Sequence, residues 1–184
     1  PERAGWEAHL DLGFERDGER TVLSRRAHVG PLRVQKALYP EGSEVCQAVV
    51  VHPPGGIVGG DRLALDVVVG TGAFAQVTTP GAAKWYRSAS ARAFLGTRLT
   101  LAAGAALEWL PLETLVFDGA NAVIDTRIEL GRGARFIGWD VVALGRTASG
   151  EQFNRGRYRQ SVELHQDGEL VWCERAVLGG GSAA

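Results

Sequence analysis

Apolar and polar side chains alternate along most of the chain, and glycine turns interrupt the alternation at short intervals. A period of two places successive side chains on opposite faces of a β-strand. The first two alternating segments, 6–14 and 21–28, flank the turn Asp17-Gly18, which predicts a β-hairpin. Further strands are predicted over 32–38 and 45–51.

From residue 63 onward one unit recurs, consisting of an alternating strand, a turn centred on glycine and a second strand. The turn glycines lie 32, 29 and 35 residues apart, at Gly72, Gly104, Gly133 and Gly168. This spacing favours stacked hairpin layers in an elongated, β-helix-like body, and an ordinary sandwich of hairpins also fits it. We therefore predict an all-β fold in a single domain over residues 1–184.

Helical periodicity is scarce. The best candidate is the segment 80–90, where Pro80 lies just inside the expected start and two alanines permit one or two turns. We expect at most one or two short helices in the chain.

The segment 52–63 contains four glycines and two prolines, which exclude both a helix and a regular strand. It lies between two predicted strands and ends on the charged pair Asp61 and Arg62. The segment is therefore a structured turn. It is either a crossover, whose Asp61 forms a salt bridge with Arg62 or caps the turn, or a functional site. Its glycines are expected to serve backbone geometry.

The composition restricts the class of protein. A net charge of -1 and the lack of a basic stripe argue against a nucleic-acid-binding protein. The apolar runs are far shorter than the roughly 20 residues that span a bilayer, and no signal segment opens the chain. Two cysteines without CxxC spacing predict reduced thiols, and the cytoplasm is the expected compartment. A start without Met and a glycine-rich end suggest a piece of a longer protein that lacks its C-terminal portion.

Five motifs follow one another along the chain. They are HPPGGIVGGD at 52–61, TTPGAAKWYR at 78–87, EWLPLE at 108–113 with FDGA at 117–120, GWD at 138–140, and GRTASGE at 145–151 with Phe153. In order and spacing these motifs resemble the family of the urease accessory protein UreD, also called UreH. The resemblance extends over nearly the whole chain. It implies a β-helix-like fold and a body that continues past residue 184.

The resemblance also implies a scaffold and metallochaperone rather than an enzyme. Members of the family bind the accessory protein UreF and, through it, the GTPase UreG, and they present nickel to apo-urease along an internal route. No cofactor is expected to be tightly bound, because nickel is in transit. Ni(II) suits imidazole, carboxylate and water ligands, and transient passage requires sparse ones. The sequence agrees, since no two of its four histidines have ligand spacing.

Three carboxylates are predicted to serve the nickel route: Asp61, Asp140 and Glu174. Asp61 ends the most constrained loop of the chain. Asp140 and Glu174 follow Trp139 and Trp172 in the second strands of two neighbouring units, so stacking should bring them together. A turn cap and exposed strand positions are the plain alternatives. We expect alanine at any of the three positions to leave folding near normal.

The residues Lys84, Trp85, Tyr86 and Arg87 form a basic and aromatic cluster in a connecting segment. Such residues often anchor protein interfaces, which predicts a partner-binding role. A capped amphipathic turn is the simpler interpretation.

Two other functions remain open. One is a β-solenoid carbohydrate-active hydrolase or lyase that uses paired carboxylates such as Asp140 and Glu174 as acid and base. The lack of a row of aromatic residues that would grip a sugar chain disfavours it. The other is a structural adaptor without a metal route, which differs from the metallochaperone only in whether the acidic residues matter.

Overall fold

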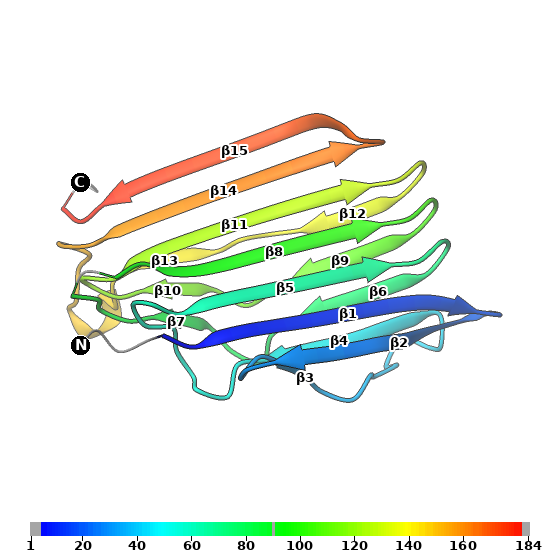
Figure 1. Ribbon diagram of the computed structural model, residues 1–184, viewed down its shortest axis with the longest axis horizontal. Helices are drawn as coiled ribbons and strands as arrows, with labels where there is room; N and C mark the ends of the chain where they lie inside the picture. The colour runs from blue at the N-terminus through cyan, green and yellow to red at the C-terminus, as the bar shows by residue number, and fades with distance from the viewer. Residues whose placement is uncertain (1–4, 90, 182–184) are drawn as a thin grey trace.

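The computed structural model describes residues 5–89 and 91–181. Within these residues the chain forms fifteen strands and one 3-10 helix, η1 (Thr147–Ser149). Figure 1 shows long strands stacked side by side into an elongated body. The all-β prediction is confirmed, and in the described part of the chain no helix has the length and apolar character that crossing a bilayer requires.

The strands form three sheets. The seven-stranded sheet has the order β15 (Glu169–Gly179), β14 (Arg157–Gln166), β11 (Asn121–Leu130), β8 (Ala93–Leu101), β5 (Arg62–Val69), β1 (Glu7–Asp17) and β2 (Arg20–Val29). The five-stranded sheet has the order β12 (Arg135–Gly138), β9 (Ala106–Leu110), β6 (Phe74–Thr78), β4 (Val45–Val51) and β3 (Arg33–Val34). The three-stranded sheet has the order β13 (Val142–Leu144), β10 (Thr114–Val116) and β7 (Ala83–Trp85).

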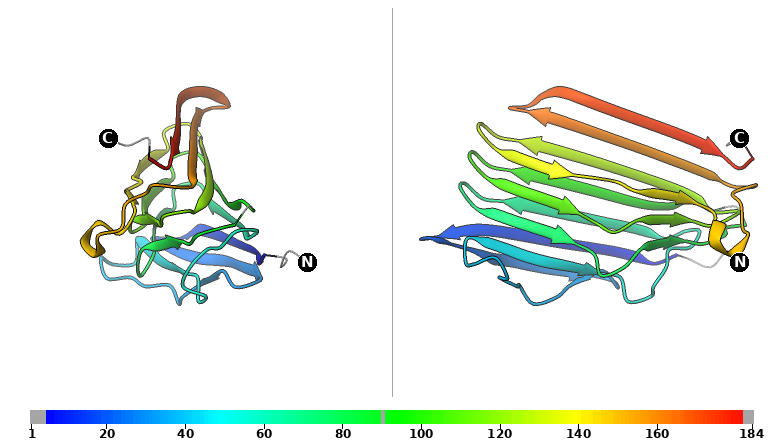
Figure 2. Two further views of the ribbon diagram at one scale, coloured as in Figure 1. Left: turned by 90° about the vertical axis from the view of Figure 1, so that its left-hand side faces the viewer. Right: turned by 180° about the vertical axis from the view of Figure 1, so that it is seen from behind.

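Three successive units, β5-β6-β7, β8-β9-β10 and β11-β12-β13, each contribute one strand to every sheet. Equivalent strands of neighbouring units pair in parallel, as where Asp66 pairs with Arg98 and Arg98 with Arg127. The body is therefore solenoid-like, and Figure 2 shows its second sheet from behind as strands lying one above the other. The predicted stacking of units is confirmed.

The pairing inside a unit differs from the predicted hairpins. In the first three units the two strands that flank the glycine turn lie in different sheets, and each pairs with the neighbouring unit. The fourth unit is a true antiparallel hairpin of β14 and β15. A glycine turn between two alternating strands is compatible with both arrangements. Which arrangement forms depends on which strand lies alongside, and the neighbouring residues in the sequence do not contain that information.

The N-terminal hairpin is confirmed, because β1 and β2 pair antiparallel around Asp17-Gly18. The strand expected over 32–38 is shorter, with two residues in β3 and an isolated bridge at Leu38. The helix expected over 80–90 is wrong. Residues Ala83–Trp85 form β7, which pairs in parallel with β10 of the next unit. Residue 90 lies outside the described residues.

Alternate side chains of the long strands point into a continuous apolar core between the sheets. The fully buried members include Leu10, Leu12, Phe14, Val67, Val69, Leu99 and Leu101. Burial of one such side chain stabilises the fold by about 1.5–3 kcal/mol relative to exposure. This core makes the stacked strands a rigid support for the segments that connect them.

Two groups of connecting segments lie at opposite ends of the body (Figure 1). The connections 79–82, 111–113 and 139–141 join the five-stranded sheet to the three-stranded sheet and belong to neither group. We call the end with the short turns 70–73, 102–105 and 131–134 the turn end. We call the opposite end, with the segments 52–61, 86–89, 117–120 and 145–156, the loop end.

Candidate functional site

Segments from four of the five motifs lie side by side at the loop end. The backbone N–H of Tyr86 donates to the carbonyl of Ile57 at 2.8 Å. Ser88 N–H donates to the Gly119 carbonyl at 3.0 Å, and Gly119 N–H donates to the Arg155 carbonyl at 2.8 Å. Motif residues that are far apart in the sequence therefore form one continuous surface.

Asp61 is completely buried and organises its own loop. One carboxylate oxygen accepts the backbone N–H of Trp6 at 2.8 Å, and the other accepts that of Val58 at 2.9 Å. The carboxylate thus caps a turn and does not pair with Arg62, which agrees with the plainer of the two interpretations. In place of near-normal folding we now expect alanine here to destabilise the protein, because the N–H groups of Trp6 and Val58 would lose their acceptors.

The glycines of this loop permit close contact with the neighbouring segment. A Cβ atom at Gly56 would overlap the ring of Tyr86, and one at Gly59 would overlap the side chain of Ser88. Beside the loop, burial lowers the pKa of His52, and the negative charge of Asp61 opposes part of this change. The Nε2 atom of His52 is buried and has no hydrogen-bond partner among the described residues.

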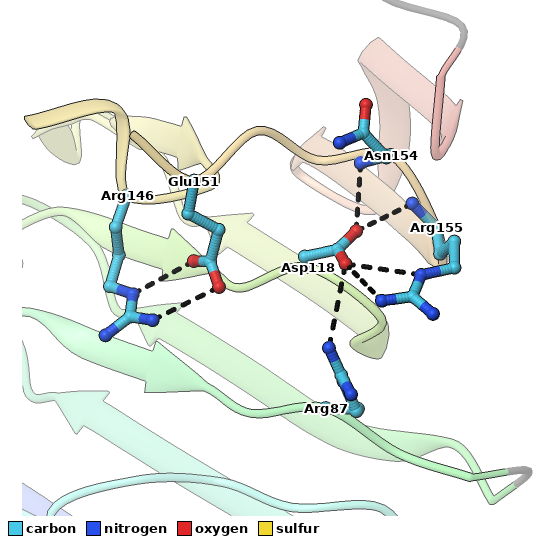
Figure 3. Close-up of polar contacts among 6 residues, drawn as sticks. All are labelled: Arg87, Asp118, Arg146, Glu151, Asn154 and Arg155. Atoms are coloured by element: carbon cyan, nitrogen blue, oxygen red, sulfur yellow. Dashed lines mark hydrogen bonds and ion pairs between the residues drawn. The ribbon is translucent and has the colours of Figure 1, made fainter. Parts of the chain in front are cut away.

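Asp118 joins three segments of the loop end (Figure 3). One of its oxygens accepts the backbone N–H groups of Asn154 at 2.9 Å and of Arg155 at 2.8 Å. The other accepts from the Arg155 guanidinium at 2.9 Å and lies 3.8 Å from that of Arg87. The hydrogen bonds from Arg155 hold the pKa of Asp118 below its usual value. This carboxylate is therefore charged at neutral pH. It fixes the position of the Arg155 guanidinium and lies near that of Arg87.

A second ion pair stabilises the loop that contains η1. The Arg146 guanidinium donates two hydrogen bonds to Glu151, at 2.9 and 3.2 Å, which lower the pKa of Glu151. The same guanidinium lies 4.8 Å from the centroid of the Phe117 ring, and that ring meets Tyr86 edge-on at 5.0 Å. These contacts connect three motif segments through side chains as well as through the backbone (Figure 3 shows the ion pair).

Asp118, Arg146 and Glu151 are not among the functional residues predicted from the sequence. All three lie in motifs that carry the resemblance, and Arg146 and Glu151 are opposite charges five residues apart. Their place in these motifs and the opposite charges of Arg146 and Glu151 were the sequence signals from which a role could have been predicted. The partners of Asp118 lie 36 and 37 residues further along the chain, so its bonds depend on how the units stack.

The predicted partner-binding cluster is divided by the fold. Trp85 is 1% exposed and belongs to the core, because its strand β7 pairs with β10. Trp85 is therefore not available as an interface anchor. Lys84, Tyr86 and Arg87 are exposed at the loop end.

Asp140 lies between β12 and β13 and is linked to β14 by hydrogen bonds. The Gln160 amide donates to the Asp140 carboxylate at 2.8 Å, and the Tyr158 hydroxyl donates to the Gln160 amide oxygen at 2.8 Å. Although Asp140 is an exposed residue, nearby protein atoms displace water from its carboxyl group and raise its pKa. The hydrogen bond from Gln160 opposes this rise, and the negative charge of Glu174 adds to it.

The structure thus brings Asp140 and Glu174 within electrostatic range of each other, whereas the oxygens of Asp61 are bound to the backbone of another loop. Around the pair, the side chains of Trp139 and Trp172 are about half exposed. Burial and the two carboxylates together raise the pKa of Tyr158. Across the described ranges, no group of three or more His, Cys, Asp or Glu side chains is placed to hold a metal ion.

Comparison with known proteins gives a consistent result. The family model described as UreD urease accessory protein matches residues 7–184. The chain is 54% identical over 175 residues to urease accessory protein UreD of Dechloromonas aromatica (strain RCB), which covers 95% of the chain and 61% of the relative. For UreD of Azoarcus sp. (strain BH72) the identity is 52% over 179 residues, covering 97% and 63%. The chain therefore spans less than two thirds of the length of these relatives.

Proposed function

The chain belongs to the UreD family of urease accessory proteins, and on this premise we propose that it acts in urease maturation as a scaffold and metallochaperone. The observation that supports the scaffold role is the loop end. There a buried core and side-chain bonds from Asp61, Asp118 and Arg146 hold segments of four motifs in one rigid surface. Rigid surfaces bind partners with little loss of conformational entropy.

The partners in this proposal are UreF, the GTPase UreG that UreF recruits, and apo-urease. Lys84, Tyr86 and Arg87 supply exposed basic and aromatic groups for such contacts. The cytoplasm is the proposed compartment. Both cysteines are free, with Cys46 buried and Cys173 exposed, as a reducing environment allows.

For nickel in transit we propose that Asp140 and Glu174 are the carboxylates of the route. The negative charge of Glu174 disfavours the charged form of Asp140, and a passing divalent cation relieves both that repulsion and the loss of hydration of the Asp140 carboxylate. Carboxylate and water are suitable ligands for Ni(II), and two carboxylates without imidazole bind it weakly enough for release. Asp61 serves the route by fixing the loop 52–61, since its two oxygens accept backbone N–H groups.

The test is maturation of urease in cells at limiting nickel. Asp140→Ala combined with Glu174→Ala should lower the nickel content and activity of urease, by roughly tenfold if both side chains contact the ion. Co-purification with UreF and UreG should be unchanged. The matched control replaces Glu19 and Glu44, two exposed carboxylates outside the candidate site, with alanine.

If the double variant forms the complex and still activates urease fully, the protein is an adaptor without a metal route. The matched relatives are named accessory proteins, which disfavours the carbohydrate-active enzyme.

A further inference from the structure

A pocket of about 300 Å³ opens at the loop end beside Asp118. Its polar lining comes from three different segments and includes Arg87, Ser88, Asn121, Arg155 and Arg157. Asn121 and Arg157 are neighbours in register at the start of β11 and β14, so the pocket begins where the regular sheet ends. The long strands therefore fix one wall, and the loops fix the other.

Positive charge dominates this pocket. The side chains of Arg87 and Arg155 are 65% and 68% exposed, whereas that of Asp118 is 10% exposed. Arg157 is exposed and forms no ion pair or side-chain hydrogen bond within the described residues. The pocket therefore carries three guanidinium groups, two of them beside the Asp118 carboxylate, in a chain whose net charge is -1.

Asp118 does not satisfy these arginines. One of its oxygens is taken by two backbone N–H groups, and the other accepts from Arg155. Arg87 lies at the longer distance of 3.8 Å. The outward donors of Arg87 and Arg157 therefore remain available to an incoming anion, and Asp118 holds the Arg155 guanidinium in place.

We propose that this pocket binds an acidic side chain of a protein partner in urease maturation. Two N–H donors of a guanidinium group match the two oxygens of a carboxylate, and several guanidinium groups in a fixed arrangement strengthen the binding of that carboxylate. The inference rests on the proposed scaffold function. The inference adds to that function the position of one contact and the chemical group that the partner presents there, which is the carboxylate of an exposed Asp or Glu.

The test measures the binding of the chain to UreF, UreG and apo-urease, each tested separately, at low and at moderate salt. Arg157→Glu should weaken binding to at least one of them by about tenfold, because it places a negative charge against the incoming carboxylate. Arg157→Gln should weaken the same interaction less, and the effect should shrink as salt screens the charges. Unfolding temperatures of both variants should match that of the unchanged chain, since Arg157 is exposed.

The matched control is Arg132→Glu, an identical charge reversal at an exposed arginine of the turn end. It should leave all three interactions unchanged. If Arg157→Glu binds every partner as the unchanged chain does, the pocket is not a contact and the inference is wrong, while the scaffold function stands. If the unchanged chain and the Arg132→Glu variant both bind none of the three proteins, the scaffold function fails and the inference fails with it.

Discussion

The two ends of the solenoid connect the same strands in different ways. At the turn end, Gly72, Gly104 and Gly133 have φ values of 65°, 66° and 67°. Each turn is closed by a backbone hydrogen bond of 3.0 or 3.1 Å between its first and fourth residues, and Gly104 N–H donates to the carbonyl of Arg132 in the next turn. One turn geometry, used three times, is enough to stack the units.

The connections at the loop end are less uniform. The turn 117–120 is closed in the same way, by a 3.0 Å bond from the Ala120 N–H to the Phe117 carbonyl, but the segments 52–61 and 145–156 are longer than the turns. The loop end is also held by individual side chains such as Asp61, Asp118 and Arg146. A repeated turn supports stacking and leaves little room for side chains, since the three turns consist mainly of glycine and alanine. A loop fixed by its own polar side chains presents different groups in each unit, which is what specific binding requires. We therefore expect the two ends to respond differently to substitution.

The largest difference should appear at Asp61. Asp61→Ala leaves the N–H groups of Trp6 and Val58 without acceptors in a buried site, and we expect it to lower the free energy of unfolding by about 2–5 kcal/mol. At the other end, Asp17→Ala removes an exposed carboxylate and should change the stability by less than about 0.5 kcal/mol. Urea unfolding of both variants measures the difference. Equal midpoints would mean that the loop 52–61 does not depend on its carboxylate.

Two glycines give the next comparison. Gly104 has open space around its missing Cβ, so Gly104→Ala should cost only the strain of a positive φ, about 1 kcal/mol. At the loop end Gly156 also has a positive φ, of 102°, and a Cβ there would overlap the backbone carbonyl of Ala120. Gly156→Ala should therefore cost more, about 3 kcal/mol. Thermal unfolding of the two variants should rank them in this order, and the reverse order would contradict the proposed rigidity of the loop end.

The turn end is also the part of the fold that the sequence predicts best. Alternation and recurrent glycines are local signals, and they correctly indicate strands, turns and stacking around Gly72, Gly104 and Gly133. The parallel pairing of neighbouring units is not a local signal. Because strand pairing is not a local signal, Trp85 was expected in a helix. It lies in strand β7 and is buried once β10 pairs with that strand.

In the candidate site, too, local sequence features could be predicted and contacts between distant segments could not. The glycine-rich loop that ends at Asp61 is recognisable because its composition excludes regular structure. Asp140 and Glu174 lie within electrostatic range of each other, but not through the predicted stacking of second strands, because β15 pairs with β14 in another sheet and Asp140 follows β12. The bonds of Asp118 were not foreseen, because Asn154 and Arg155 reach it only after a complete further unit has been placed. Each correct prediction used a repeat or a composition, and each missed contact depended on the packing of distant segments.

The smallest predicted effect compares the carboxylates Asp118 and Asp140 as the pH changes. The pKa of Asp118 is lowered, so its stabilising effect is present above its unfolded pKa of about 3.8 and is lost as the pH falls through the folded value. The pKa of Asp140 is raised, so its effect is opposite: it is fully present below about 3.8 and is lost as the pH rises through the folded value.

Asp118→Asn should therefore lower the unfolding temperature at neutral pH. Asp140→Asn should raise it slightly, since an amide still accepts the hydrogen bond from Gln160 and no longer repels Glu174. The difference for Asp140→Asn should shrink as the pH falls through the raised pKa of Asp140, and the difference for Asp118→Asn should shrink only at lower pH, as the pH falls through the lowered pKa of Asp118. Asp140 is exposed, and solvent screening keeps its effect small. A lower unfolding temperature for Asp140→Asn at neutral pH would show that the charged carboxylate stabilises this region. Asp118 and Asp140 would then affect the stability in the same direction.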